Sequence, residues 1–214
     1  MNRKMAWQVV AIVALVGWAT WNFLGVSPGR ALDLQPYEAL GVVAGEEASR
    51  LVGGAGEVGL VLPDDGGEAN PVMDAQVEAF RKGLASAGRA RVGKVSRVVI
   101  DGFTAMRTGG AVPLERLASL LEEHRGARAV VFFMGLPMAD ESVLGRAVVG
   151  DRKLVVVSAP FPWYPAMVHQ GLVHRAIVSR AGTASPGEGS GTGGASREVF
   201  DREYQILKPA ASDP

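Results

Sequence analysis

Cysteine is absent from the 214-residue chain, and histidine is scarce. Without cysteine the protein can form no disulfide bond, no thiolate metal site, no cysteine nucleophile and no lipoprotein attachment. Its three histidines are His124, His169 and His174. A zinc site would need two or three of them to converge with a carboxylate, and His124 ends a predicted helix, where a cation suits the helix dipole. The sequence predicts no metal site.

Residue patterns typical of catalysis are also missing. Ser158 ends a predicted strand, but no Gly-x-Ser-x-Gly turn surrounds it. Two Gly-x-Gly-x-x-Gly patterns occur, at 54–59 and at 189–194. The first precedes a predicted strand and the second lies in a glycine-rich segment, whereas a dinucleotide site needs these glycines between a strand and a helix. We therefore predict no cofactor and no enzymatic activity.

No charge of one sign dominates the chain, which holds 22 basic and 22 acidic residues. The N-terminal segment 1–30 contains Arg3, Lys4 and Arg30 and no acidic residue, so the rest carries a small acidic excess. A body of this kind, without a basic stripe, is not expected to bind nucleic acid.

One long segment, residues 5–26, contains no charged residue and is almost entirely apolar. Its length is sufficient for a helix to cross a hydrocarbon core of about 30 Å. Arg3 and Lys4 precede it, and such a positive flank places residues 1–4 in the cytoplasm. We predict a single-pass anchor in the inner (cytoplasmic) membrane, with the remainder of the chain in the periplasm or outside the cell.

A cleavable signal peptide is the alternative interpretation of this segment. Small residues at 27–29 fit a cleavage site, but the apolar run exceeds the roughly 7–15 residues usual for a signal peptide. Tryptophans stand near both ends of the run, as in the aromatic belts at membrane interfaces: Trp7, Trp18 and Trp21. We therefore expect a retained anchor that contacts the lipid bilayer through residues 5–26.

Strand and helix patterns alternate along residues 46–180. Short, nearly continuous apolar runs at 58–62, 130–134 and 154–157 are typical of parallel strands that are covered on both faces. The segments between them repeat apolar residues every three or four positions, as amphipathic helices do. This alternation predicts an α/β lobe with a doubly wound, mostly parallel open sheet.

Three further segments flank this lobe. Residues 27–45 combine proline, glycine and small apolar residues, and we interpret them as a tether that a short helix, beginning near Glu46, follows. Residues 181–196 contain six glycines and no large apolar side chain, which is typical of a flexible linker. Residues 197–214 carry apolar side chains able to dock a helix or a strand onto the lobe.

Glycine and turn residues occur at the ends of several predicted elements: Gly54, Gly56, Asn70, the Ala79-Phe80 pair, Gly171 and Pro186. Their order over residues 46–188 resembles the second lobe of type I periplasmic sugar-binding proteins and of the repressors related to them. In that family Gly-x-Gly leads into the first strand, an asparagine-rich turn opens a helix ending in Gly-Phe, and a late helix ends in glycine. The resemblance implies a periplasmic-binding-protein-like fold.

The sugar-contacting residues of that family have no counterpart here. Family members use an arginine before the Gly-Phe pair, Asn-Asp after the third strand and an aspartate after the fourth. The corresponding positions hold Gln76, Gly135 with Leu136, and Ala159. An unpaired buried polar group costs about 1–3 kcal/mol, so losing these anchors is expected to abolish recognition of sugar. The family's first lobe is not found either, so a cleft needs a second wall from another chain.

Apolar and aromatic residues follow two of the predicted strands. Because open α/β sheets bind ligands or partners at the carboxyl ends of their strands, we predict such a surface at Met134, Leu136, Met138, Phe161, Trp163 and Tyr164. Aromatic side chains on a proline-bracketed loop are typical of protein interfaces. The alternative is that Trp163 and Tyr164 pack beneath the chain's own tail.

The sequence leaves three functions open. The first is a membrane-anchored extracytoplasmic interaction or scaffolding module, an accessory subunit of a larger membrane complex with another membrane or periplasmic protein as partner. The alternative is a solute-binding or sensor lobe for a small, largely apolar ligand, in which a homodimer would build the cleft. The third, an enzyme that uses Asp64, Asp65 or Asp101, lacks a base and a nucleophile to accompany them.

Overall fold

The computed structural model describes residues 32–64, 66–67, 69–139, 144, 150–158, 161–180 and 196–209. The predicted cytoplasmic tail, the predicted anchor with its three tryptophans, and nearly all of the predicted linker lie outside these ranges. Within them, no helix is long and apolar enough to span a bilayer. The anchor therefore stays a prediction from the sequence.

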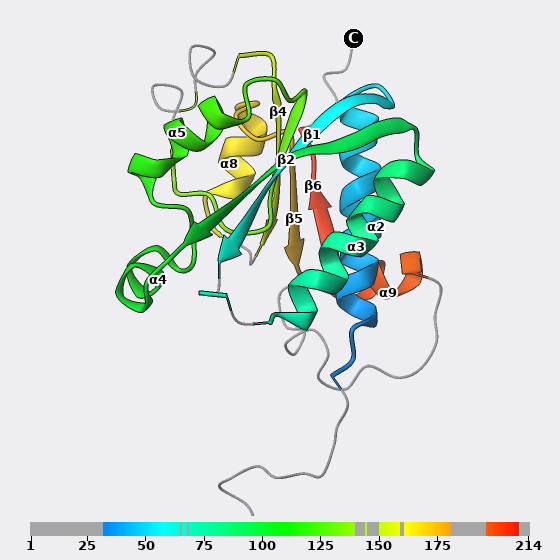
Figure 1. Ribbon diagram of the computed structural model, residues 1–214, viewed down its shortest axis with the longest axis horizontal. Helices are drawn as coiled ribbons and strands as arrows, with labels where there is room; N and C mark the ends of the chain where they lie inside the picture. The colour runs from blue at the N-terminus through cyan, green and yellow to red at the C-terminus, as the bar shows by residue number, and fades with distance from the viewer. Residues whose placement is uncertain are drawn as a thin grey trace, which may run out of the picture. The chain divides into compact units, whose positions relative to one another are not determined.

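Helices and strands alternate along the described chain (Figure 1). In order they are α2 (Gln35–Leu51), β1 (Ala55–Asp64), α3 (Pro71–Ser86), β2 (Arg89–Val99), α4 (Gly102–Thr108), α5 (Leu114–Glu123), β3 (Ala129–Phe132), β4 (Lys153–Ser158), α8 (Tyr164–His169), β5 (Arg175–Ser179), α9 (Ser196–Glu203) and β6 (Tyr204–Leu207). The strands form one sheet in the order β2-β1-β3-β4-β5-β6. Neighbouring strands are parallel from β2 to β5, and β6 is antiparallel to β5. The predicted α/β class and mostly parallel sheet are confirmed.

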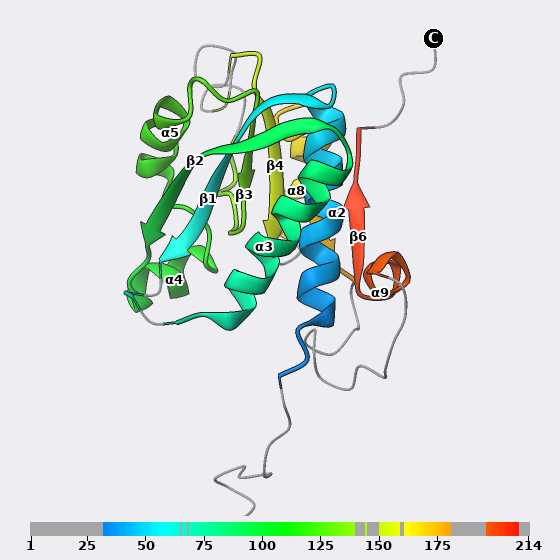
Figure 2. The same ribbon diagram turned by 45° about the vertical axis from the view of Figure 1, so that its right-hand side comes forward.

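Helices cover both faces of the sheet (Figure 1, Figure 2). Residues of α2, α3 and α9 form one apolar cluster with the sheet, and residues of α5 and α8 form another on the opposite face. The central strand β3 is buried along its whole length, which is why its sequence, Ala-Val-Val-Phe, is apolar throughout. This burial on two sides explains the continuous apolar runs in the sequence.

Glycines bring α2 and α3 into close contact. A Cβ atom added at Gly41 would lie 2.3 Å from the backbone oxygen of Gln76, and one added at Gly45 would lie 2.3 Å from that of Phe80. Gly83 of α3 makes a similar approach to the backbone of α2. Any side chain at these positions would force the two helices apart.

The first described helix is longer than the sequence predicted. The prediction placed a tether at residues 27–45 and a helix start near Glu46, but α2 begins at Gln35. Pro36 lies in the first turn, where a helix tolerates proline. Gly41 and Gly45, which favoured a tether in the sequence, are contact residues between helices instead. Residues 35–45 therefore belong to the lobe.

The C-terminal segment returns to the lobe as both a helix and a strand (Figure 2). Val199 and Phe200 of α9 are buried in the cluster that α2 and α3 share. In β6, Tyr204 pairs with Ser179 of β5 and is also buried. The lobe thus extends beyond residue 180, the end that the sequence predicted for it.

Candidate functional site

Five parallel strands end at one edge of the sheet, which we call the carboxyl edge. Their last residues are Asp64, Val99, Phe132, Ser158 and Ser179. The arrowheads of β2 and β5 point to this edge in Figure 1. Open α/β sheets bind their ligands outside the carboxyl ends of the strands, where the strand order reverses. In this sheet the order reverses between β1 and β3.

A pocket of about 290 Å³ opens at the carboxyl edge, beside the ends of β1 and β2. We call it the edge pocket. Its lining comes from the turn after β1, the first turn of α3 and strand β2: Asp64, Gly67, Ala69, Asn70, Met73, Asp74 and Arg97.

Local backbone structure fixes the polar side chains of the edge pocket. The Gly66 N–H donates a hydrogen bond to Asp64 Oδ1 at 3.2 Å, which shapes the turn after β1. Asn70 caps α3, because its Oδ1 accepts a hydrogen bond from the Met73 N–H at 2.9 Å. Asp74 lies in the first turn of the same helix, where a carboxylate suits the positive end of the helix dipole.

The lining of the edge pocket combines acceptors with donors. The carboxylates of Asp64 and Asp74 accept hydrogen bonds, whereas the guanidinium of Arg97 only donates them. A hydroxyl group donates and accepts at the same time, so neighbouring hydroxyls on one ligand can use both kinds of partner. The arrangement suits a small polyhydroxylated ligand better than an apolar one.

Half of the predicted apolar surface is buried in the lobe. Leu136 and Tyr164 are 0% exposed, and Met134 is buried as well. The Leu136 N–H donates a hydrogen bond to Tyr164 Oη at 3.0 Å, and Trp163 Nε1 donates one to the Leu136 carbonyl at 3.1 Å. These bonds tie the loop after β3 to α8. Tyr164 therefore packs beneath that loop, and its side chain is not exposed to a partner.

The other three predicted residues differ in exposure. Phe161 and Trp163 are half-buried and stack on each other with ring centroids 4.6 Å apart. Phe161 fills space that two glycines leave, since a Cβ at Gly109 or Gly135 would lie 3.1 or 2.7 Å from its ring. Met138 is 72% exposed. The predicted surface is thus reduced to Met138 and the outer faces of two stacked rings.

An exposed apolar surface, which the sequence did not predict, lies on α4, the helix that follows β2. Phe103 is 70% exposed and Met106 is 87% exposed, and no residue of α4 is buried. Val99, at the end of β2, is exposed too. The Thr104 N–H and hydroxyl donate to the Asp101 carboxylate, and these hydrogen bonds hold the pKa of Asp101 below its ordinary value. Asp101, which the sequence offered as a candidate catalytic residue, caps the N-terminus of α4.

Comparisons with known proteins identify the fold. No family model matches the chain, and no curated protein matches it in sequence. Among solved structures, XylFII superposes with a TM-score of 0.51 at 17% identity over 81% of this chain and 61% of that one. A complex of XylFII with LytSN gives 0.52, at 17% identity over 80% and 59%. The fold is that of a type I periplasmic binding protein.

A third structure with this fold contains a ligand. It is an ABC transporter solute-binding protein from Burkholderia graminis C4D1M in complex with D-arabinose, with a TM-score of 0.50 at 14% identity over 80% of this chain and 59% of that one. The chain spans about three fifths of the length of these structures. The structure accordingly corresponds to a lobe of the fold, as the resemblance in sequence implied.

The positions aligned with the sugar-contacting residues of such lobes offer little for binding. Gln76 is buried in α3 on the side that approaches α2. Gly135 forms a bridge with Ala111, and Leu136 is buried. Ala159 lies outside the described residues. Polar groups at the carboxyl edge instead come from the edge pocket. The sequence did not predict this pocket, because Arg97 of β2 joins the residues of the turn after β1 only through the pairing of β1 with β2.

The histidines lie on separate elements. His124 is buried, and its Nε2 donates to Ser96 Oγ at 3.0 Å, since that hydroxyl itself donates to Glu123. His174 Nδ1 accepts a hydrogen bond from the Leu154 N–H at 3.3 Å. Among the residues that the structure describes, no group of three or more histidines and acidic residues is placed to hold a metal ion.

Proposed function

We propose that the chain is a solute-binding or sensor lobe that holds a small polar ligand at the carboxyl edge of its sheet. The observation that carries this proposal is the edge pocket, with Asp64, Asp74 and Arg97 in its lining, at the edge where sheets of this kind bind ligands. The fold supports it further, because one structure with this fold is a solute-binding protein that holds D-arabinose.

The ligand class follows from the lining. A largely apolar ligand would need an apolar floor, but Leu136, Met134 and Tyr164 are buried within the lobe. Charged side chains line the edge pocket instead. A polyhydroxylated ligand, such as a monosaccharide, fits these groups, through contacts that differ from the sugar anchors of related lobes.

The proposed ligand site needs a second wall to enclose its ligand. The edge pocket is open to one side, whereas ligand sites usually bury most of the surface of a small ligand. The wall would come from another protein or a second copy of the chain. XylFII is found in a complex with LytSN, so one protein of this fold does assemble with another.

The location proposed for the lobe is the outer side of the cytoplasmic membrane, where the predicted anchor at residues 5–26 would hold it. Solute capture outside the membrane agrees with the positive flank of that segment. The exposed face of α4 would then be available to a membrane or periplasmic partner. This exposed apolar face supports an interaction module as a second candidate function.

Calorimetric titration tests the ligand site on the full chain in mild detergent. We expect D-arabinose, or another member of a panel of pentoses and hexoses, to bind with a Kd near 1 mM, about −4 kcal/mol, because one wall alone buries little of a sugar. The double variant Asp64→Asn with Arg97→Gln should weaken this binding at least tenfold.

The matched control is Glu78→Gln, an exposed position of α3 outside the lining of the edge pocket. It should bind the same sugar as the parent chain does. Absence of binding across the panel, or equal binding by the double variant, would reject the sugar site.

A further inference from the structure

The large apolar side chains that are exposed lie mainly at one end of the lobe. Among the described residues they are Leu32, Val95, Val99, Phe103, Met106, Leu114 and Met138. Val99 ends β2, and Phe103 and Met106 lie on α4 directly after it. Met138 lies in the loop after β3. The exposed apolar surface thus concentrates at the carboxyl edge, and a surface of this kind marks a site of contact with a protein or a membrane.

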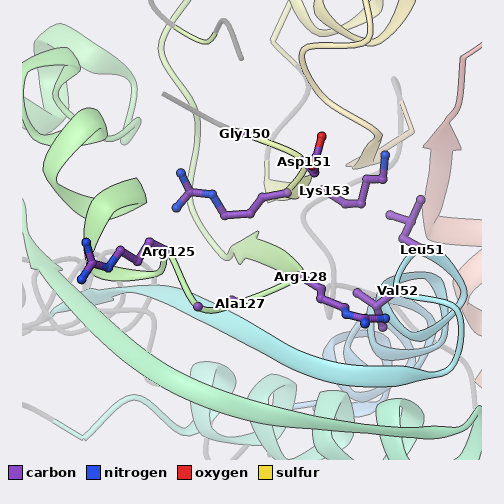
Figure 3. Close-up of a pocket in the computed structure, with 10 residues that line it drawn as sticks. Leu51, Val52, Arg125, Ala127, Arg128, Gly150, Asp151 and Lys153 are labelled. Carbon is purple, nitrogen blue, oxygen red and sulfur yellow. The ribbon is translucent and has the colours of Figure 1, made fainter. Parts of the chain in front are cut away.

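The opposite edge of the sheet, where the parallel strands begin, has a different surface (Figure 3). A pocket of about 540 Å³ opens there between the end of α2 and the turns before β3 and β4. Basic side chains dominate its lining, and those of Arg125, Arg128 and Lys153 point in different directions. Among the described residues, none of the exposed large apolar side chains lines this pocket. The two ends of the lobe therefore differ in polarity.

Helix α4 combines apolar side chains with a basic one. Phe103 and Met106 are exposed, and no residue of α4 is buried. The Arg107 guanidinium lies 5.8 Å from the centre of the Phe103 ring. Aromatic and apolar side chains with basic ones beside them are typical of segments that lie in the interface of a bilayer. The Asp101 carboxylate accepts hydrogen bonds from Thr104, so it belongs to the helix cap.

The first described helix, α2, begins at the same end of the lobe as α4. Gly41 of α2 approaches Gln76 of α3, and Gly45 approaches Phe80, so the two helices run in the same direction. Because α3 follows the end of β1, both helices begin at the carboxyl edge. In both views α4 and the first turn of α2 lie in the lower part of the lobe (Figure 1, Figure 2). Leu32, which is also exposed, precedes α2.

The connection between the predicted anchor and α2 is short. The anchor ends at residue 26 and α2 begins at Gln35, so eight residues separate them. Fully extended, a segment of this length spans at most about 30 Å. A compact lobe of this size is about 40 Å across. The connection is thus too short for the lobe to turn its opposite edge to the membrane, and the carboxyl edge stays the nearer one.

We propose that α4 inserts Phe103 and Met106 into the outer surface of the bilayer that holds the predicted anchor. The proposal rests on the proposed location of the lobe outside the membrane, but not on the proposed sugar site. Apolar contact is its basis, rather than attraction to anionic lipid, because Asp64 and Asp74 lie at the same edge as Arg107. The Arg107 guanidinium would remain among the lipid head groups while its aliphatic part covers the apolar boundary.

A bilayer fits this surface better than a protein partner does. Protein interfaces place their main anchor residues in well-packed pockets of the other partner. Helix α4, which has no buried residue, needs no such matching shape to enter lipid. The short connection also keeps the bilayer close to the carboxyl edge at all times, whereas a protein partner would have to fit between the two.

Site-specific fluorescent labelling tests this contact, because the chain has no cysteine of its own. The full chain with Met106→Cys, labelled and reconstituted into phosphatidylcholine vesicles, is compared in vesicles with and without lipid that carries a nitroxide high in its acyl chain. The matched control is a label at Asp151→Cys, an exposed position in the pocket at the opposite edge (Figure 3). We expect the nitroxide to quench the label at position 106 at least threefold more strongly than the label at position 151.

A second substitution tests whether α4 itself makes the contact. Phe103→Ser, added to the chain with Met106→Cys, should reduce the quenching at least twofold, because the helix loses its other apolar side chain. Phe103→Leu, which keeps an apolar side chain, should retain the quenching. Neither change should lower the melting temperature appreciably, since Phe103 is 70% exposed.

The membrane contact is rejected if the labelled chain does not float with the vesicles, if the two labels are quenched equally, or if Phe103→Ser acts no differently from Phe103→Leu. A chain that floats while its label at position 106 stays unquenched would exclude the bilayer as the contact of α4 and favour a protein partner instead. Sugar binding, measured by calorimetry in detergent, is decided separately from all of these outcomes.

Discussion

Glu47 is buried with 1% exposure and lies among three cations. Its carboxylate pairs with Arg175 of β5 at 2.9 Å, with Lys208 after β6 at 3.7 Å and with Arg50 one turn along α2. Burial alone would raise the pKa of Glu47, but the hydrogen bond from Arg175 and the nearby positive charges outweigh it and lower that pKa. A single side chain thus connects α2 with β5 and with the residue that follows β6.

His174 gives the stability of the lobe a dependence on pH. Burial, with the charges of Lys153 and Arg175, lowers the pKa of His174 to about 4 from an ordinary value of 6.5. As the pH falls from about 6.5 towards 4, His174 becomes protonated in the unfolded chain but stays neutral in the folded chain. The free energy of unfolding therefore decreases over this range. We expect this histidine to account for a loss on the order of 2 kcal/mol over that range.

The variant His174→Asn tests this dependence, because asparagine Oδ1 can still accept the hydrogen bond from the Leu154 N–H. Urea unfolding at several pH values between 7 and 4.5 should show a shallower decline for the variant than for the parent chain. His169→Asn, at an exposed position of α8, is the control and should follow the parent. Identical slopes for parent and His174→Asn would contradict the prediction.

The contact between α2 and α3 tolerates no side chain at Gly41. The variant Gly41→Ala places a methyl group 2.3 Å from the Gln76 backbone oxygen, and this atom cannot move without the helix. We expect the free energy of unfolding to fall by about 1–3 kcal/mol, as measured by chemical denaturation.

Gly102→Ala is a suitable control for this variant. Gly102 begins α4, and no heavy atom lies within 4 Å of the added methyl group. The control should be neutral or slightly stabilising, because alanine favours a helix. Equal stability of the Gly41 and Gly102 variants would show that α2 and α3 separate at little cost.

The elements that the sequence predicted best are those with purely local signals. Continuous apolar runs predicted β1, β3 and β4, and the asparagine before Pro71 caps α3 as such a sequence does. The predicted start of α2 was wrong because Gly41 and Gly45 were interpreted as tether residues. They are instead contact residues with α3, a helix that follows α2 in the chain only after β1. The hydrogen bond from Leu136 to the Tyr164 hydroxyl also joins distant segments, so the sequence alone could not show that these residues are buried.

The whole lobe depends on its C-terminal segment for closure of one core. Val199, Phe200 and Tyr204 are buried with residues of α2 and α3, and burial of each such side chain stabilises a fold by roughly 1.5–3 kcal/mol. A chain that ends at residue 195 should therefore unfold at a much lower temperature or be insoluble, as thermal denaturation would measure. A shorter deletion, of residues 185–190 within the predicted linker, is the control. A truncated chain as stable as that control would contradict the role given to α9 and β6.

At the other side of the sheet, β2 is the outermost strand. Arg89, Arg91, Lys94 and Arg97 are all exposed along it, although Arg91 and Lys94 have carboxylate partners within the lobe. Pairing of two copies through β2 would bring their two rows of cations together, and these like charges would repel each other. Charged side chains of this kind protect edge strands against edge-to-edge aggregation. Continuous fibres through this strand are therefore disfavoured, and a second wall for the ligand site would have to approach the lobe across the ends of its strands.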